Sequence, residues 1–145
     1  QFIIQPFIEG KEFSVDAWLD NNYGLKGIIL RYRDLIMHGE SQITTTFKNE
    51  KIGDKICEII HHLKLTGPIV IQAIIDKHEG LHIIECNPRF GGGSSLSIKA
   101  GLDSMYWSLC ESLGYNVKEL PFNRSDKELR QIRMPQDTYQ YDFSI

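Results

Sequence analysis

The chain has 145 residues, of which 41% are hydrophobic and 24% are charged, and its formal net charge is −3. This composition is typical of a globular domain, and a weakly acidic chain gives no electrostatic reason to expect nucleic acid or an anionic membrane as a partner. No apolar run reaches the roughly 20 residues of a membrane helix, and the three cysteines lack CxxC spacing, which favours reduced thiols and a cytoplasmic location over a zinc site.

The first half of the chain predicts an antiparallel sheet. One stretch alternates between apolar and polar side chains, as a half-buried strand does, with Phe13, Val15 and Ala17 on its apolar side. The turn signals of residues 20–24 join this stretch to the next strand as a hairpin. Residues 34–40 lack such a pattern and are expected to be irregular. The strands expected here are residues 1–8, 12–19, 25–32 and 41–47.

The second half predicts helices around a second hairpin. Isoleucine and leucine recur at helical spacing before Gly67-Pro68, which ends the helix. Two β-branched runs follow, joined by a short polar loop that ends in Gly80. Two short helices come after the hairpin. The elements expected here are a helix over residues 49–63, strands over 69–76 and 81–87, and helices over 94–100 and 103–113.

This order of elements predicts an α+β domain, a mostly antiparallel sheet with helices packed on one face. The domain is expected to cover residues 1–121. Residues 122–145 are polar and weakly periodic, so they either dock on the domain or continue into a further segment. Because the chain opens without Met and within a strand-like pattern, we expect it to be a fragment or an isolated domain.

The second hairpin is predicted to carry a row of polar side chains. Glu85 and Asn87 lie two residues apart, so they share one face of their strand, while Cys86 takes the other face. The row adjoins Arg89 in the sequence ECNPRFGGG. The bland alternative is a solvated hairpin face with a trailing loop, but several polar residues on one face of apolar strands favour a binding site.

The expected register adds a third polar side chain to this row. Pairing of Asp76 with Leu81 places Gln72 opposite Glu85, with Cβ atoms roughly 5 Å apart. A carboxylate is costly to bury without a partner, and carboxylate and amide oxygens suit a hard ion such as Mg²⁺. The predicted metal ligands are therefore Gln72, Glu85 and Asn87.

Arg89 and three glycines, Gly91, Gly92 and Gly93, follow the row directly. A guanidinium offers a planar fork to phosphate oxygens, and glycines let a phosphate or a substrate approach backbone N–H groups. The glycine run alone is weak evidence. It is neither a Walker A loop, because no Lys-Ser or Lys-Thr follows, nor a Rossmann fingerprint.

Four further side chains are candidate binding residues, and each also has an ordinary structural explanation. Glu12, on the polar side of its strand, is either an exposed carboxylate or a ligand for both hydroxyls of a ribose. Arg31 and Arg33 share a face if their strand continues, and they are either solvated or bind a phosphate or a substrate carboxylate. His38 is either a surface histidine or part of a loop that reaches the site.

Four sequence blocks resemble the ATP-grasp superfamily, and its carbamoyl-phosphate-synthase-like members most closely. They are IIQPFIEGKEFSVD, RYRD with the HGE that follows, GPIVIQA, and IIECNPRFGGGSSLSIKAG, within about residues 1–113. The resemblance implies ATP with Mg²⁺ or Mn²⁺ as cofactors and an ADP-forming ligase. Such an enzyme activates a small carboxylate or bicarbonate as an acyl phosphate, which an amine then attacks. The resemblance also implies that the N-terminal subdomain with its phosphate-binding lysines is missing from this chain, which would be inactive alone.

The resemblance carries roles over residue by residue. Its catalytic positions match Asn87 and Arg89, and its metal positions match Glu85, Asn87 and, at or next to the metal, Gln72. The nucleotide-binding positions match Glu12 at the ribose, His38 in a nearby loop, and Gln5, Phe7 and Ile8 in the linker whose backbone reads adenine. Gln5-Pro6 departs from the usual Glu followed by an aromatic residue. A non-catalytic nucleotide-binding module is the alternative function, and a homodimer is an open alternative for the assembly.

Overall fold

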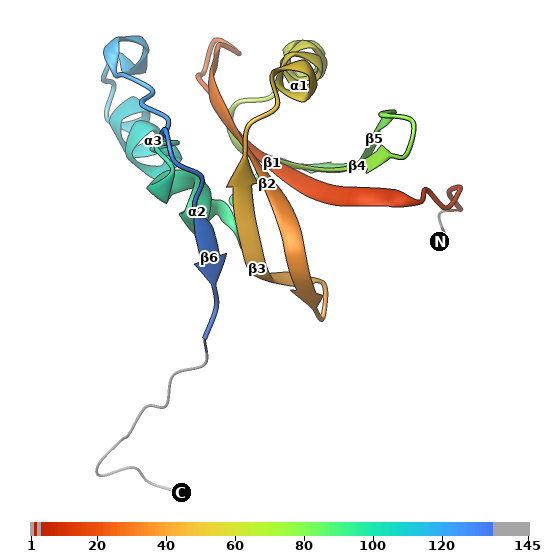
Figure 1. Cartoon of the computed structure of the whole chain (residues 1–145). Helices are drawn as coiled ribbons and strands as arrows, with labels where there is room; N and C mark the ends of the chain where they lie inside the picture. The colour runs from red at the N-terminus through yellow and green to blue at the C-terminus, as the bar shows by residue number, and fades with distance from the viewer. Residues whose placement is uncertain (1, 3, 135–145) are drawn as a thin grey trace, which may run out of the picture.

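The computed structural model describes residues 2 and 4–134. A six-stranded sheet with the order β5-β4-β1-β2-β3-β6 forms its centre, and all its paired neighbours are antiparallel (Figure 1). The predicted α+β class is confirmed. The strands are β1 (Gly10–Leu19), β2 (Leu25–Met37), β3 (Glu40–Phe47), β4 (Gly67–Asp76), β5 (Leu81–Asn87) and β6 (Arg130–Ile132); the helices are α1 (Glu50–Leu63), α2 (Ser94–Lys99) and α3 (Ser104–Ser112), with a 3-10 turn at Val117–Glu119.

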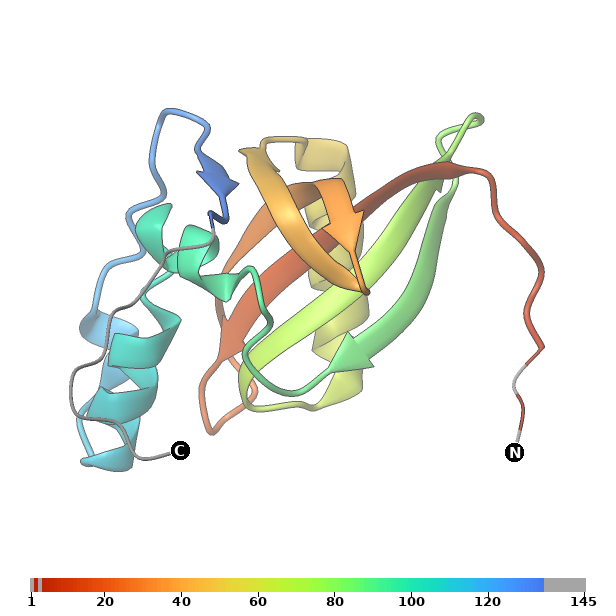
Figure 2. The ribbon, with the colours of Figure 1, turned by 90° about the horizontal axis from the view of Figure 1, so that it is seen from below.

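The alternation predicted for β1 sets the two faces of the sheet. Its apolar side packs against Ile56 and Ile60 of α1. Trp18 points to the opposite face and packs against Trp107 of α3, with 5.6 Å between ring centroids. The helices are therefore divided between the faces, whereas one face was expected, because β1 carries large apolar side chains on both sides. Figure 2 shows α1 behind the strands and the α2–α3 pair at one side.

The predicted strand over residues 1–8 is not present in the described part of that segment. Residues 4–9 pair with no strand, and Ile4 and Phe7 are 95% and 92% exposed. Apolar composition alone predicts a strand, but the pairing of β1 with β4 ends at Gly10 and Asp76, where β4 itself ends, so the β1–β4 ladder does not reach residues 4–9. Figure 2 shows this N-terminal segment running away from the sheet.

Strand β2 is longer than expected. Residues 34–37, predicted to be irregular, continue the pairing with β3 through register shifts between Arg33 and Ile36. The strand then turns at His38 and Gly39, whose φ angles are 51° and 80°. Two successive left-handed residues are the turn that best matches the twist of a tight hairpin. The extension makes Arg33 an internal residue of a strand and fixes the direction of its side chain.

The β4–β5 hairpin contains the predicted polar pair, Gln72 and Glu85, but its register near the loop differs from the predicted one. Gln72 lies opposite Glu85, as expected, but Leu81 pairs with Ile75 and not with Asp76. Ile84 is the extra residue of a bulge that restores the pairing. Cys86 lies on the opposite face and packs against the α1 core, as predicted.

Asp76 organises the loop of this hairpin. Its Oδ1 accepts the N–H groups of His78 and Gly80, each at 2.8 Å, and its Oδ2 lies 2.7 Å from His82 Nε2. The hydrogen bond with His82, followed by those from Gly80 and His78, lowers the pKa of Asp76 to about 2. Because the folded pKa lies below the ordinary value, the carboxylate stabilises the loop above about pH 4, and this stabilisation is lost as the pH falls toward 2.

We therefore expect amide exchange at Gly80 to accelerate between about pH 4 and 2 in the native chain, beyond the intrinsic change of exchange with pH. The Asp76→Asn variant lacks the titrating group and is the control: the protection of its loop amide should not change over this interval. Hydrogen exchange followed by NMR measures both. Equal pH dependence of protection in the two proteins would contradict this role of Asp76.

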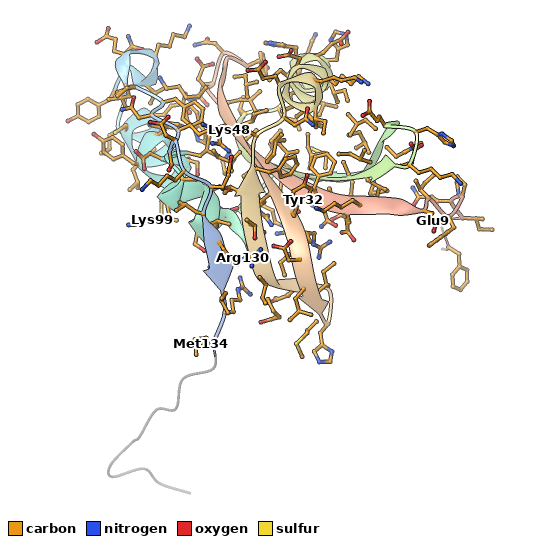
Figure 3. The ribbon with its side chains drawn as sticks, viewed as in Figure 1. Glu9, Tyr32, Lys48, Lys99, Arg130 and Met134 are labelled. Carbon is orange, nitrogen blue, oxygen red and sulfur yellow. The ribbon has the colours of Figure 1, made fainter. Side chains whose placement is uncertain are left out.

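Residues 122–134 pack against the rest of the domain. Phe122 packs edge-on against Trp107, with ring centroids 6.1 Å apart. β6 pairs with β3, and Arg130, which Figure 3 labels on β6, donates from its Nε to Thr45 Oγ1 at 2.8 Å. The division at residue 121 stays a prediction, and residues 135–145 lie outside the described part. None of the described helices has the length and apolar character needed to cross a membrane.

Candidate functional site

The predicted polar row is present on the face of the sheet opposite α1. Gln72 Nε2 and Asn87 Nδ2 donate to the same oxygen of Glu85, Oε1, at 2.7 and 2.8 Å. Glu85 is exposed, while Gln72 and Asn87 are half-buried. Two amides thus hold one carboxylate oxygen, and within the described residues Glu85 Oε2 and Asn87 Oδ1 accept no hydrogen bond. These two oxygens are the free acceptors of the row.

Arg33 extends the row across β1 to β2. Its Nη1 donates to Gln72 Oε1 at 2.8 Å and to a carboxylate oxygen of Glu12, while its Nε contacts Ser41 Oγ at 3.1 Å. Its Nη2 donates to the Gly39 carbonyl at 2.7 Å. All three nitrogens of Arg33 are therefore engaged by the protein, so this guanidinium positions Glu12 and Gln72.

A cavity of about 160 Å³ lies beside the row. Parts of the strands, the β2–β3 turn and the glycine loop surround this cavity. Arg31 and Arg33 of β2 line it together with Arg89, which precedes the glycine loop. The cavity is lined by Ser14, Arg31, Arg33, Gly39, Glu40, Ser41, Val70, Gln72, Asn87, Arg89, Gly91, Gly92 and Gly93. The fold therefore brings Arg31, Arg33, Gln72, Asn87, Arg89 and the three glycines, which come from separate sequence blocks, to one cavity.

Arg31 is held by a buried network centred on Asp16. The side chains of Arg31 and Asp16 are only 3% and 4% exposed, and Arg31 Nε donates to Asp16 Oδ2 at 2.6 Å. Ser94 Oγ and Ser97 Oγ, both on α2, donate to the two oxygens of the same carboxylate at 2.5 and 2.8 Å. Asp16 therefore fixes α2, and with it the end of the glycine loop, to the sheet.

Each glycine of the loop lies against a different neighbour. A Cβ atom at Gly93 would lie 2.5 Å from Nη1 of Arg31, and one at Gly91 would lie 3.0 Å from a methyl group of Val70. A Cβ atom at Gly92 would lie 3.3 Å from Nη2 of Arg133. The loop has glycine at Gly93 because the backbone packs directly on a guanidinium there.

Arg133, just beyond β6, joins the two sides of the cavity. Its Nη1 donates to Glu40 in the β2–β3 hairpin at 2.8 Å, its Nη2 donates to the Gly92 carbonyl, and its backbone N–H donates to Gln42 at 2.9 Å. The C-terminal segment thus fastens the glycine loop to the hairpin.

Some predicted residues do not reach the cavity. Gln5 and Phe7 are exposed and Ile8 is half-buried on the segment before β1, and none of them lines it. His38 is exposed at the turn, where only its neighbours Gly39 and Glu40 face the cavity.

Arg89, in contrast, lines the cavity as well as donating to the Phe90 carbonyl at 3.0 Å.

Sequence reasoning overlooked several residues of the site. Asp16 and Ser94 are not among the predicted site residues, although a carboxylate flanked by Val15, Ala17 and Trp18 on a buried strand signals a partner. No local signal identifies Arg133, because its partners lie about 40 and 90 residues earlier.

The donor set of the row is consistent with a hard cation that also binds phosphates. Among the described residues, no group of three or more His, Cys, Asp and Glu side chains is placed to hold a metal. Glu85 Oε2 and Asn87 Oδ1 are free, whereas Gln72 Oε1 accepts from Arg33. The row therefore offers a carboxylate and one amide oxygen, which suits Mg²⁺ only if phosphate oxygens or water complete its coordination.

Residues 1–135 match the family described as "ATP-grasp in the biosynthetic pathway with Ter operon". No curated protein sequence matches the chain significantly. Among solved structures, the biotin carboxylase β,γ-ATP complex of Campylobacter jejuni is 19% identical with a TM-score of 0.63, over 76% of this chain and 27% of that one.

Two further structures have the same fold. The biotin carboxylase domain of Hydrogenobacter thermophilus 2-oxoglutarate carboxylase, solved with MgADP and bicarbonate, has 14% identity and a TM-score of 0.69, over 86% of this chain and 30% of that one. The L-amino acid ligase of Bacillus licheniformis has 19% identity and a TM-score of 0.65, over 90% and 35%. At these identities the likeness establishes the fold alone.

The chain spans 27%, 30% and 35% of the lengths of these three proteins. The family match covers nearly all of the chain, including the polar row, the glycine loop and β6. The fold of the chain and the resemblance of its sequence blocks to the ATP-grasp superfamily both agree with this family match. The chain therefore belongs to the ATP-grasp family of the biosynthetic pathway with the Ter operon.

Proposed function

We propose that this chain supplies one wall of an ATP-grasp active site, which binds ATP with Mg²⁺ or Mn²⁺ and belongs to an ADP-forming carboxylate–amine ligase. The observation that carries the proposal is the polar row of Gln72, Glu85 and Asn87, which continues into an arginine-lined cavity on the same face. The other wall, with phosphate-binding lysines, would come from an N-terminal subdomain outside this chain.

In this proposal the residues act by binding and orientation. Glu85 and Asn87 hold the metal, while Gln72 orients Glu85 through its N–H group instead of ligating. When bound, the metal neutralises charge on the phosphate oxygens. Arg89 faces the transferred phosphoryl group, Glu12 binds the ribose, and the backbone of Gln5, Phe7 and Ile8 faces adenine, with His38 near the nucleotide.

The reaction that fits this arrangement has two steps. A carboxylate oxygen of the acceptor, or of bicarbonate as in carbamoyl-phosphate-synthase-like enzymes, forms a bond to the γ-phosphorus as the bond to ADP breaks. An amine then forms a bond to the acyl carbon and gives up a proton to the departing phosphate or to water, and phosphate leaves with the electron pair of the broken C–O bond. Such a transfer depends on electrostatic stabilisation and positioning, and none of the roles assigned here requires a covalent nucleophile from the protein.

Replacing Glu85 by Gln in the protein that contains this chain should lower kcat for ADP release by about a hundredfold, because the variant keeps the shape but loses the charge that faces the metal. Glu58→Gln is the matched control, since Glu58 is an exposed carboxylate on α1, on the other face of the sheet. A panel of amino acids and bicarbonate would supply the acceptor.

ADP release by Glu85→Gln at the wild-type rate would contradict the proposal. Saturable Mg-ATP binding without ADP release for any acceptor would instead favour a non-catalytic nucleotide-binding module. Analytical ultracentrifugation of the same protein would decide whether it forms a homodimer.

A further inference from the structure

The cavity is lined by the guanidinium of Arg31, and not all of its hydrogen-bond donors have a partner among the described residues. Arg31 is almost fully buried, and its Nε is bound to Asp16. Within the described residues its terminal nitrogens, Nη1 and Nη2, make no hydrogen bond, although Arg31 lines the cavity. Neither nitrogen is fully enclosed by the surrounding protein without a partner, so both are accessible from the cavity, where an added acceptor can reach them.

The other two arginines of the cavity differ from Arg31 in this respect. Arg33 gives every nitrogen to the protein, with Glu12 as its carboxylate partner. Arg89 is exposed, so water can solvate it. Glu40, the acidic residue of the lining, is already paired with Arg133. Arg31 is therefore the buried donor that remains for an added anion.

The network around Asp16 sets the orientation of the Arg31 fork. Asp16 accepts hydrogen bonds from Arg31 Nε and from two serine hydroxyls of α2, so the carboxylate cannot rotate freely. The backbone of Gly93 packs on the guanidinium, since a Cβ there would lie 2.6 Å from Cζ. A guanidinium fixed in this way binds an anion with little further loss of conformational freedom.

We propose that Arg31 is the binding group of an oxyanion subsite that takes a carboxylate or a phosphoryl group, and that Asp16 is its positioning residue. The backbone N–H groups of Gly92 and Gly93, which make no hydrogen bond within the described residues, provide further donors. A cavity of about 160 Å³ has room for such a head group. The assignment rests on the proposed function, because this oxyanion would be the acceptor carboxylate or the phosphoryl group that it meets beside Asn87 and Arg89.

NMR titration of the 145-residue chain tests the subsite directly. Sodium acetate and inorganic phosphate are the two probes, at an ionic strength held constant with sodium chloride. We expect saturable shifts of the Gly92 and Gly93 amides and of Arg31 Nε with at least one probe. Tighter binding of acetate would assign the subsite to the acceptor carboxylate, and tighter binding of phosphate would assign it to the phosphoryl group. Unchanged Gly92, Gly93 and Arg31 signals with both probes would overturn the proposal.

Two variants test the subsite independently, one by changing the guanidinium and the other by changing the backbone position that packs on it. Arg31→Lys keeps the charge but lacks the fork, and should weaken probe binding by about tenfold. Gly93→Ala keeps the ion pair and has a backbone φ of −100° that alanine adopts freely, but its Cβ displaces or covers the fork. It should weaken binding by at least as much. Arg130→Lys, an exposed change on β6 outside the cavity, is the control and should bind as the native chain does.

Native affinity in both Arg31→Lys and Gly93→Ala would overturn the role of Arg31. If Arg31→Lys fails to fold, Gly93→Ala decides alone. A parallel titration with Mg-ADP separates this inference from the proposed function: shifts at Asn87 without shifts at Gly93 in any titration would reject the subsite and leave the nucleotide site. Shifts at Gly93 with acetate or phosphate, but none at Asn87 with Mg-ADP, would support the subsite and count against the nucleotide site.

Discussion

Replacing Asp16 by Ala should lower the free energy of unfolding by about 3–5 kcal/mol, because the substitution leaves the charge of Arg31 buried without its partner. The ion pair is among the most buried polar contacts of the domain, with side chains 3% and 4% exposed. The same change removes the acceptor of the Ser94 and Ser97 hydroxyls. Chemical denaturation followed by circular dichroism measures the effect.

Two companion variants separate charge burial from the loss of an ordinary contact. Glu79→Ala removes the Lys51–Glu79 ion pair, whose side chains are 67% and 77% exposed, and should leave stability almost unchanged. The double variant Asp16→Leu/Arg31→Met replaces the buried pair by apolar groups and should recover most of the lost stability. A loss below about 1 kcal/mol in Asp16→Ala would show that water reaches Arg31 and that the network is not closed.

Replacing Trp107 by Ala should cost a similar amount, about 3–5 kcal/mol, through lost burial and an unfilled cavity. The indole is 1% exposed and lies between Trp18 of β1 and Phe122 of the C-terminal segment, at centroid distances of 5.6 and 6.1 Å. Deleting this side chain removes the contact through which α3 and residues near Phe122 both pack on the sheet.

The neighbouring side chain on the same helix provides the control for Trp107→Ala. Tyr106 is 56% exposed, and Tyr106→Ala should change the free energy of unfolding by less than about 0.5 kcal/mol. Both variants are measured by denaturant titration at equal protein concentration. Equal stability of the two variants would mean that α3 does not contribute to the cooperative core.

Elements with a strong period were predictable from the sequence. The helix over residues 49–63 follows from its repeat and is capped by the Asn49 side chain, which accepts the Ile52 N–H at 3.1 Å. The alternation of β1 predicted the face that packs against α1. Gln72 opposite Glu85 was predicted correctly, although the register assumed near the loop was wrong. Local period determines these features because each depends on residues close in sequence.

Features that depend on distant pairing were not predictable in the same way. The N-terminal segment has the composition of a strand, but residues 4–9 lie beyond Gly10, where the pairing of β1 with β4 ends. The contact of Asp16 with Arg31 depends on the β1–β2 register, in which Ser14 and not Asp16 lies directly opposite Arg31. β6 has only three residues, Arg130–Ile132, and its place beside β3 depends on an available edge rather than on its own pattern.

The bulge at Ile84 determines where insertions and deletions can occur in the β4–β5 hairpin. Ile84 has no partner on β4, so a chain that lost this one residue would pair Ile83 with Ala73 and Glu85 with Gln72 as before, in a regular ladder. Losing a residue between Glu85 and Arg89 has no such compensation, because a one-residue slip moves side chains to the other face. The hairpin can therefore vary in length on the loop side of Glu85 during evolution, while the spacing from Glu85 to the glycine loop is fixed.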